Sequence, residues 1–266
     1  MSANVSSIIR WAGSKRKLLT VLIKEMPISF DRYVEPFCGS ASLYFKAPTK
    51  YGLLSDINGE LINAWENIKR DSYIRNDLIV LPNTKEFYYE MRSRDPKGLT
   101  DRERAVRFLY LNRYCFNGVY RTNRKGVYNV PRGSRTGDFP SQEAFDLASK
   151  KLSACELVAC DYKTSLTRLK PDDFVYIDPP YTSASKFTGE YGVDSFSYQE
   201  MPQLLKSLEM IDEMGGKFLL SYVANEDVVS ALRENYIVKH LSVARHVQGF
   251  KTTWGSSEEI LVKNYG

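Results

Sequence analysis

The stretch "RYVEPFCGSASLYFKAPTKYGLLSDINGELINAWENIKR", residues 32–70, contains the pattern that decides the fold. Residues 32–37 read as a short apolar strand entering a turn, and residues 51–56 read as a second strand ending in an aspartate. A short helix is expected between them, at 39–47, and an amphipathic helix follows at 57–70. Strand, turn, helix and strand in this order indicate parallel pairing, so the sequence predicts an α/β fold.

The alternation of strands and helices returns in the second half of the chain. A helix is predicted at 197–214, and apolar strands are predicted at 155–160, 173–178, 217–222, 236–243 and 258–265. These strands extend the sheet that begins at residue 32. We therefore expect a mostly parallel α/β domain, built from residues 1–58 and 150–266.

The segment between these two pieces, residues 59–149, has a different pattern. Helical periodicity at 84–94 and 100–115 is not separated by any strand. Residues 118–130, "GVYRTNRKGVYNV", read as a β-hairpin with turn residues at its centre. The sequence thus predicts a helical insertion that carries a β-hairpin.

A glycine turn follows the first strand. In "VEPFCGSAS", residues 34–42, Gly39 lets the backbone approach a ligand closely. The full GxGxxG pattern of a pyrophosphate site is absent. Asp56 ends the next strand, 17 residues later (56 − 39), where an acid can bond ribose hydroxyls. Together these residues favour a nucleoside-containing ligand without a pyrophosphate over a purely structural turn.

The strand at 173–178 ends in "DPPY", residues 178–181. Two prolines fix the backbone and donate no hydrogen bond, so the carbonyl of Pro179 and the carboxylate of Asp178 are held as acceptors. Tyr181 adds a flat aromatic face. This set suits a planar group with an NH2, because fixed acceptors stabilise the positive charge that develops when the amine attacks. We prefer this reading to a capped structural turn.

At this point the sequence resembles a known family, the Dam-type DNA adenine-N6 methyltransferases. The resemblance covers almost the whole chain and rests on motifs in the family's order. They are "RWAGSK" at 10–15, "EPFCGSAS" at 35–42, "SDIN" at 55–58, "FLYLNRYCFNGVYRTNRKGVYNVPRG" at 108–133, "CDYKTSL" at 160–166 and "IDPPY" at 177–181. The resemblance implies S-adenosylmethionine as methyl donor and the class I methyltransferase fold, with helices on both faces of the sheet.

The resemblance also implies roles for single residues. The catalytic motif is Asp178, Pro179, Pro180 and Tyr181. Cofactor contacts fall on Trp11, Lys15, Glu35, Phe37, Gly39, Asp56, Asp161, Tyr162 and Asp178. DNA contacts fall on Arg10, Asn117, Val119, Arg121, Asn123, Lys125, Pro131 and Arg135. Three residues depart from the family pattern: Arg10 replaces an expected lysine, and Ser14 and Ala41 each replace an expected glycine.

Charge in the insertion supports a nucleic-acid partner. The whole chain carries only +5, but residues 113–137 contain six basic residues and no acidic one. Four aromatic residues are interleaved with them, at Tyr114, Phe116, Tyr120 and Tyr128. Basic residues contact phosphates, aromatic rings can stack or wedge, and a two-stranded ribbon fits the major groove. We expect 59–149 to recognise double-stranded DNA and the target adenine to be flipped out.

The sequence leaves open the DNA target and two alternative functions. The similarity to Dam in the recognition segment implies duplex GATC, with Arg121 placed to read guanine. The chain could instead methylate another amine, such as cytosine N4, although Asp178 favours adenine. A catalytically inactive DNA-binding regulator is the second alternative, and the intact "DPPY" and "PFCG" argue against it.

The remaining expectations concern location and further partners. We find no apolar run near the roughly 18 residues of a membrane span and no zinc-type spacing of cysteine and histidine. We expect a cytoplasmic protein, encoded by a bacterium or a phage, that acts on DNA as a monomer. No metal and no membrane contact are expected.

Overall fold

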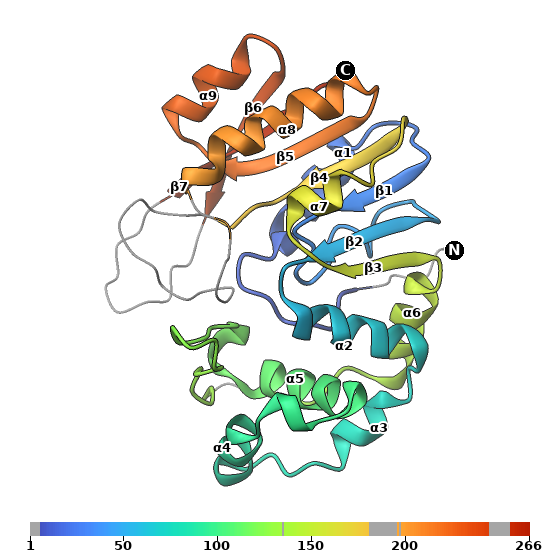
Figure 1. Ribbon diagram of the computed structural model, residues 1–266, viewed down its shortest axis with the longest axis vertical. Helices are drawn as coiled ribbons and strands as arrows, with labels where there is room; N and C mark the ends of the chain where they lie inside the picture. Colours follow the sequence, from blue (N-terminus) through green and yellow to red (C-terminus); the bar gives the residue numbers. More distant parts are fainter. Residues whose placement is uncertain (1–5, 135, 181–195, 197, 245–255) are drawn as a thin grey trace.

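The computed structural model describes residues 6–134, 136–180, 196, 198–244 and 256–266. Tyr181 and Arg135, two predicted site residues, lie outside these ranges, which Figure 1 draws in colour. No helix in the described part of the chain is long and apolar enough to cross a membrane.

Within the described ranges, seven strands form one sheet in the order β3-β2-β1-β4-β5-β7-β6 (Figure 1). Strands β1 to β5 pair in parallel, and β7 is antiparallel to both of its neighbours. Their bounds are β1 (Arg32–Glu35), β2 (Gly52–Asp56), β3 (Cys155–Ala159), β4 (Asp173–Ile177), β5 (Lys217–Val223), β6 (Ile237–Ala244) and β7 (Ser256–Lys263). The predicted mostly parallel α/β fold is confirmed.

The described helices are α1 (Leu19–Glu25), α2 (Gly59–Arg70), α3 (Ile74–Ile79), α4 (Lys85–Ser93), α5 (Asp101–Tyr114), α6 (Gln142–Leu152), α7 (Tyr162–Leu166), α8 (Met201–Glu213) and α9 (Glu226–Arg233). Helices cover both faces of the sheet, whereas α3 and α4 pack on α5, which packs on α2 in the insertion (Figure 1). Successive strand residues point to opposite faces. Tyr33 and Tyr176 therefore join the core under α1, α2 and α6, whereas Val34 and Val175 join the core under α7, α8 and α9.

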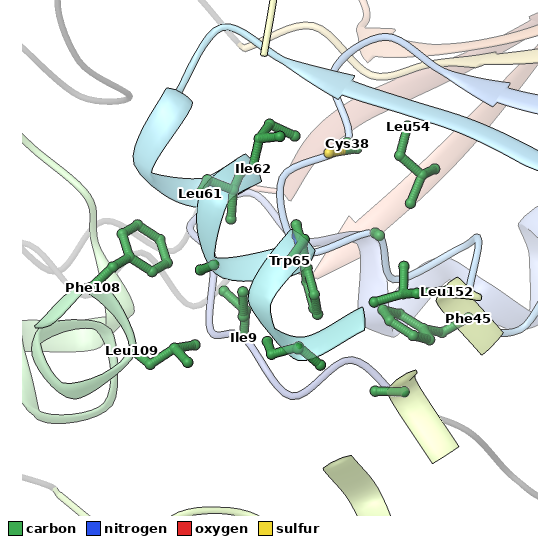
Figure 2. Packing of buried hydrophobic residues seen from close by; sticks show 14 of the residues in the cluster. Ile9, Cys38, Phe45, Leu54, Leu61, Ile62, Trp65, Phe108, Leu109 and Leu152 are labelled. Carbon is green, nitrogen blue, oxygen red and sulfur yellow. The ribbon is translucent and has the colours of Figure 1, made fainter. Parts of the chain in front are cut away.

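The insertion shares the first of these cores with the sheet. Figure 2 shows Trp65 of α2 among side chains from both sides, with Leu54 and Cys38 on the sheet side and Phe108 and Leu109 on α5. Trp65 is fully buried, and burying such a side chain stabilises the fold by about 1.5–3 kcal/mol. The recognition segment is therefore anchored to the same core as the sheet.

Two local predictions need correction. Residues 39–47 form a series of turns and not the predicted helix, because Gly39 and Ala41 adopt left-handed φ values of 45° and 50° that a right-handed helix does not contain. The predicted hairpin is present as antiparallel arms joined by the bridges Cys115↔Arg132 and Thr122↔Tyr128, not as two continuous strands.

Candidate active site

A pocket opens at the carboxyl ends of β1, β2 and β4. The strand order reverses between β1 and β4, and ligands bind at such switch points in open α/β sheets. The pocket encloses about 920 Å³, including open solvent at its mouth. It brings together residues from six segments that are distant in the sequence: 11–15, 35–43, 56–57, 161–162, 176–180, and Phe196 with Glu200.

All nine residues predicted to contact the cofactor line this pocket: Trp11, Lys15, Glu35, Phe37, Gly39, Asp56, Asp161, Tyr162 and Asp178. Pro179 and Pro180 line it as well. The structure therefore brings all of these residues together around one pocket. Tyr181 lies outside the described residues.

Asp178 extends from the end of β4 into the pocket and accepts hydrogen bonds from two side chains. Lys15 Nζ lies 2.6 Å from its Oδ1, and the Ser221 hydroxyl donates to the same oxygen at 2.9 Å. Burial raises the pKa of Asp178 above its ordinary value, while Lys15 and Ser221 lower that pKa. The carboxylate is thus held in a fixed position, stabilised by one charged donor and one neutral donor.

Asp56 ends β2 and is fixed by the backbone. Its Oδ2 accepts the Gly39 N–H at 3.0 Å, and its Oδ1 accepts the Asn58 N–H at 2.9 Å. Burial raises the pKa of Asp56 to about 6, although these two bonds favour the charged form. Each carboxylate oxygen still has a further lone pair, so Asp56 can accept bonds from two ligand hydroxyls.

Gly39 lies directly under the indole of Trp11. A Cβ atom at position 39 would come within 2.6 Å of Trp11 Cδ1, closer than side chains approach. The Gly39 carbonyl accepts a bond from Trp65 Nε1 at 3.0 Å. Trp11 also stacks on Tyr120 of the insertion, with ring centres 5.9 Å apart. The glycine turn therefore allows Trp11 to lie between the pocket and the recognition segment.

Three aromatic rings form another wall of the pocket. Phe37 stacks on Tyr162 with centres 5.1 Å apart, and Phe196 packs edge-on against both rings. Asp161 caps helix α7 by accepting the Lys163 N–H at 2.8 Å. This cap explains why α7 begins at Tyr162 and points that ring at the pocket.

The charges that line the described pocket are mostly negative. Five carboxyl groups line it, at Glu35, Asp56, Asp161, Asp178 and Glu200, against the single ammonium of Lys15. Glu35 is buried and accepts a bond from the Tyr33 hydroxyl at 3.0 Å, and burial raises its pKa well above the ordinary value. Such a wall suits a ligand that carries positive charge. Among the residues that the structure describes, the pocket included, no group of three or more His, Cys, Asp or Glu side chains could hold a metal ion.

The predicted DNA residues cluster around the hairpin. Arg121 donates from Nε to Asn129 Oδ1 at 2.9 Å. The Asn123 side chain closes the turn by accepting the N–H groups of Lys125 and Val127. The DNA contact that the resemblance implies for Asn123 stays a prediction, and in this structure its side chain holds the turn together.

The other predicted DNA contacts lie close to that loop. Asn117 has a left-handed φ of 53°, and Lys125 and Pro131 are exposed, whereas Val119 is half-buried. Arg10 donates to the Arg113 carbonyl at 2.9 Å, which holds the N-terminal motif against the insertion. Arg135 lies outside the described residues.

The four interleaved aromatic residues have unequal surroundings. Tyr114 and Tyr128 are buried in the core, and Tyr120 packs on Trp11. Among the four, only Phe116 is exposed, with 46% of its surface accessible. The expectation that all four could stack or wedge is therefore too broad, because two of them are core residues and Tyr120 is partly buried against the core.

Several pocket residues and one neighbour were not among the predicted site residues. Phe196 and Glu200 come from the segment after the DPPY turn, where no motif was visible. Ser221 lies inside the apolar strand "KFLLSYV", and its only signal was a polar residue on the strand face shared with Leu219. A hydroxyl in an otherwise apolar strand indicates a buried partner, and here that partner is Asp178.

Fold and pocket together define a class: an α/β protein with a nucleoside-type site beside a fixed acidic turn and a basic hairpin. Comparison with known proteins gives the family. Residues 11–248 match the D12 class N6 adenine-specific DNA methyltransferases. The chain belongs to this family, so it is an adenine-specific DNA methyltransferase, as the motifs predicted.

Curated relatives agree with this assignment. The type II methyltransferase M1.LlaDCHI of Lactococcus lactis subsp. cremoris is 30% identical, covering 99% of this chain and 96% of that protein. The DNA adenine methylase of Escherichia coli strain K12 is 31% identical, covering 96% and 92%. The type II methyltransferase M.MjaIII of Methanocaldococcus jannaschii is 29% identical, covering 98% and 99%. These relatives and the family therefore favour adenine N6, and not cytosine N4, as the amine that is methylated.

Proposed function

We propose that this chain transfers the methyl group of S-adenosylmethionine to N6 of the adenine in duplex GATC, acting as a monomer. The observation that carries the proposal is the single pocket in which the glycine turn, the acid after β2 and the acidic turn after β4 meet. Residues 1–58 and 150–266 would supply catalysis, and residues 59–149 would supply target recognition.

The residues of the pocket fit this cofactor. S-adenosylmethionine supplies a methyl group already activated on a positively charged sulfonium. The five carboxyl groups around one ammonium favour a cationic ligand. Asp56 offers fixed acceptors for ribose hydroxyls. Asp161 and Tyr162 are proposed to contact the adenine ring of the cofactor. Trp11, Lys15, Glu35, Phe37 and Gly39 complete the proposed cofactor wall.

Asp178 is proposed to hold the target amine. Its carboxylate, together with the Pro179 carbonyl, accepts the two N–H groups and stabilises the positive charge that grows on nitrogen during attack. The two prolines keep these acceptors in place before the base arrives. After transfer, Asp178 can take the surplus proton and release it to solvent. Tyr181 is proposed to stack on the base.

The hairpin is proposed to enter the major groove. Arg121 can bond guanine O6 and N7 together, and Val119 can contact a thymine methyl. Lys125 and Arg135 are assigned to phosphates, which position the protein without reading sequence. Phe116 is the exposed ring available to fill the space left by a flipped adenine, a step that costs a few kcal/mol of unstacking.

The direct test uses plasmid DNA from a methylation-deficient host that expresses this protein. The plasmid should resist an endonuclease whose cleavage at GATC is blocked by adenine methylation. Methyladenine found in another sequence would support the assigned enzyme class but reject GATC as the target. Duplex binding with neither cofactor binding nor methyladenine would favour the inactive DNA-binding regulator instead.

A further inference from the structure

The hydrogen bonds that Lys15 and Ser221 donate to Asp178 end on one oxygen. Lys15 Nζ and Ser221 Oγ each contact Oδ1, at 2.6 and 2.9 Å, and neither bond uses Oδ2. Ser221 comes from β5, the strand beside β4, and its side chain is fully buried. The hydroxyl therefore contacts Asp178 from the protein interior and does not itself line the pocket.

A second buried hydroxyl lies behind the first. Tyr176 Oη and Ser221 Oγ are 3.0 Å apart, and Tyr176 is also buried. A serine hydroxyl has a single proton, which Ser221 donates to the carboxylate. Tyr176 must then donate to Ser221, so the chain runs Tyr176 to Ser221 to Asp178. Donors aligned in one direction strengthen the last bond in the series.

We propose that Ser221 is a positioning residue for methyl transfer: its hydroxyl, backed by Tyr176, pins Oδ1 of Asp178 so that Oδ2 faces the target amine. This inference rests on the proposed function, because it assumes that Asp178 accepts the amine. Ser221 would act through Asp178 and would not touch either substrate.

The charged groups around Asp178 decide the sign of the pH effect. Lys15 contacts it from the 3-10 helix η1 (Lys15–Leu18), and the carboxyl groups of Glu35 on β1 and Glu259 on β7 lie near enough to interact with it. Loss of the Ser221 hydroxyl removes a donor that favours the charged form, so the pKa of Asp178 rises. The acidic limb of the kcat profile should then move to higher pH.

The test compares Ser221→Ala with Ser207→Ala, a matched control. Ser207 is also a buried serine, but its hydroxyl bonds the Gln203 carbonyl on α8. Ser221→Ala should lower kcat by about tenfold to a hundredfold and shift the acidic limb upward. The KM for DNA and the cofactor affinity should stay within about twofold, since the amine acceptor is displaced and the binding groups remain. Ser207→Ala should leave kcat and the acidic limb at wild-type values.

Two further variants test the same proposal if Ser221→Ala fails to fold. Ser221→Cys replaces the hydroxyl with a weaker donor of similar shape, and Tyr176→Phe removes the second hydroxyl. Both variants should move the acidic limb of the kcat profile to higher pH, but by less than Ser221→Ala does. Carbon-13 NMR titration of the Asp178 carboxyl in the free protein measures the same pKa change without turnover. A folded Ser221 variant with unchanged kcat and unchanged Asp178 titration overturns this proposal alone. A wild-type protein that transfers no methyl group would instead overturn the proposed function.

Discussion

Lys15 Nζ lies 2.6 Å from Asp178 Oδ1, and the two side chains are only 8% and 17% exposed. A cation from the N-terminal motif is thus paired with the acid of the catalytic turn, across 163 residues of sequence. Removing one member of a buried pair leaves the other charge uncompensated. Substitutions at either residue will therefore change stability as well as chemistry, and the first prediction separates the two.

Asp178→Ala should reduce kcat by at least about a hundredfold, because it removes the acceptor that stabilises the developing charge. It should also lower the melting temperature, since the buried ammonium of Lys15 loses its ion pair with the Asp178 carboxylate. Asp178→Asn keeps the shape and one carbonyl acceptor, so it should recover the melting temperature and only part of the rate. Methyl transfer by folded Asp178→Ala within about tenfold of wild type would contradict the assignment.

The second prediction concerns pH and Asp56. The pKa of Asp56 is raised to about 6 by burial, and ribose hydroxyls bond best to its charged form. Cofactor affinity should therefore be constant above pH 6 and weaken by about tenfold for each pH unit below it. Calorimetry on both sides of this value measures the effect. Asp56→Asn should bind more weakly and lose this pH dependence, and a wild-type affinity that is flat across the range would reject the role of Asp56.

The third prediction tests the close approach at the glycine turn. Gly39→Ala places a methyl group 2.6 Å from Trp11 Cδ1 at a residue with φ of 45°, so it should displace the indole and destabilise the fold by about 1–3 kcal/mol. Cofactor affinity should fall with it. Gly59→Ala is the matched control, because its Cβ meets nothing within 4 Å and it lies in the first turn of α2. That variant should be neutral or slightly stabilising.

The fourth prediction separates reading of sequence from general attraction to DNA. Arg121→Ala should cost about 1–3 kcal/mol on the cognate site and relax the choice of base at the guanine. Asn129→Ala should do the same more weakly, because Asn129 Oδ1 fixes the Arg121 guanidinium at 2.9 Å. Lys125→Ala is the control: it should weaken all duplexes alike and reduce the salt slope by about one. Binding isotherms on cognate and single-base-changed duplexes at several salt concentrations would show whether the three variants differ in this way.

Strands β1, β2, β4 and β5 were predictable from the sequence because parallel strands in the middle of a sheet are buried on both faces and give short continuous apolar runs. The other three strands, β3, β6 and β7, also overlap predicted segments. The turns over 39–47 were not predictable in the same way. Their residues have apolar spacing typical of a helix, and only the backbone angles of Gly39 and Ala41 show why no helix forms there.

The site was predictable where a motif combined unusual residues, as at Gly39, Asp56 and Asp178. It was not predictable where the interacting side chain belongs to a common residue type and is brought to the site only by strand pairing. Ser221 contacts Asp178 only because β5 pairs with β4, and neither strand's sequence names the other as neighbour. Phe196 likewise joins Phe37 and Tyr162 through folding alone.

Trp11 contacts both the pocket and the insertion. One edge of its indole covers Gly39 in the pocket, and its face stacks on Tyr120 of the recognition segment. If cofactor and DNA each restrict this ring, each ligand reduces the ordering that the other must impose. The cofactor should then tighten duplex binding, and by thermodynamic reciprocity the duplex should tighten cofactor binding by the same factor. Ternary complexes would accumulate at concentrations where neither binary complex is abundant.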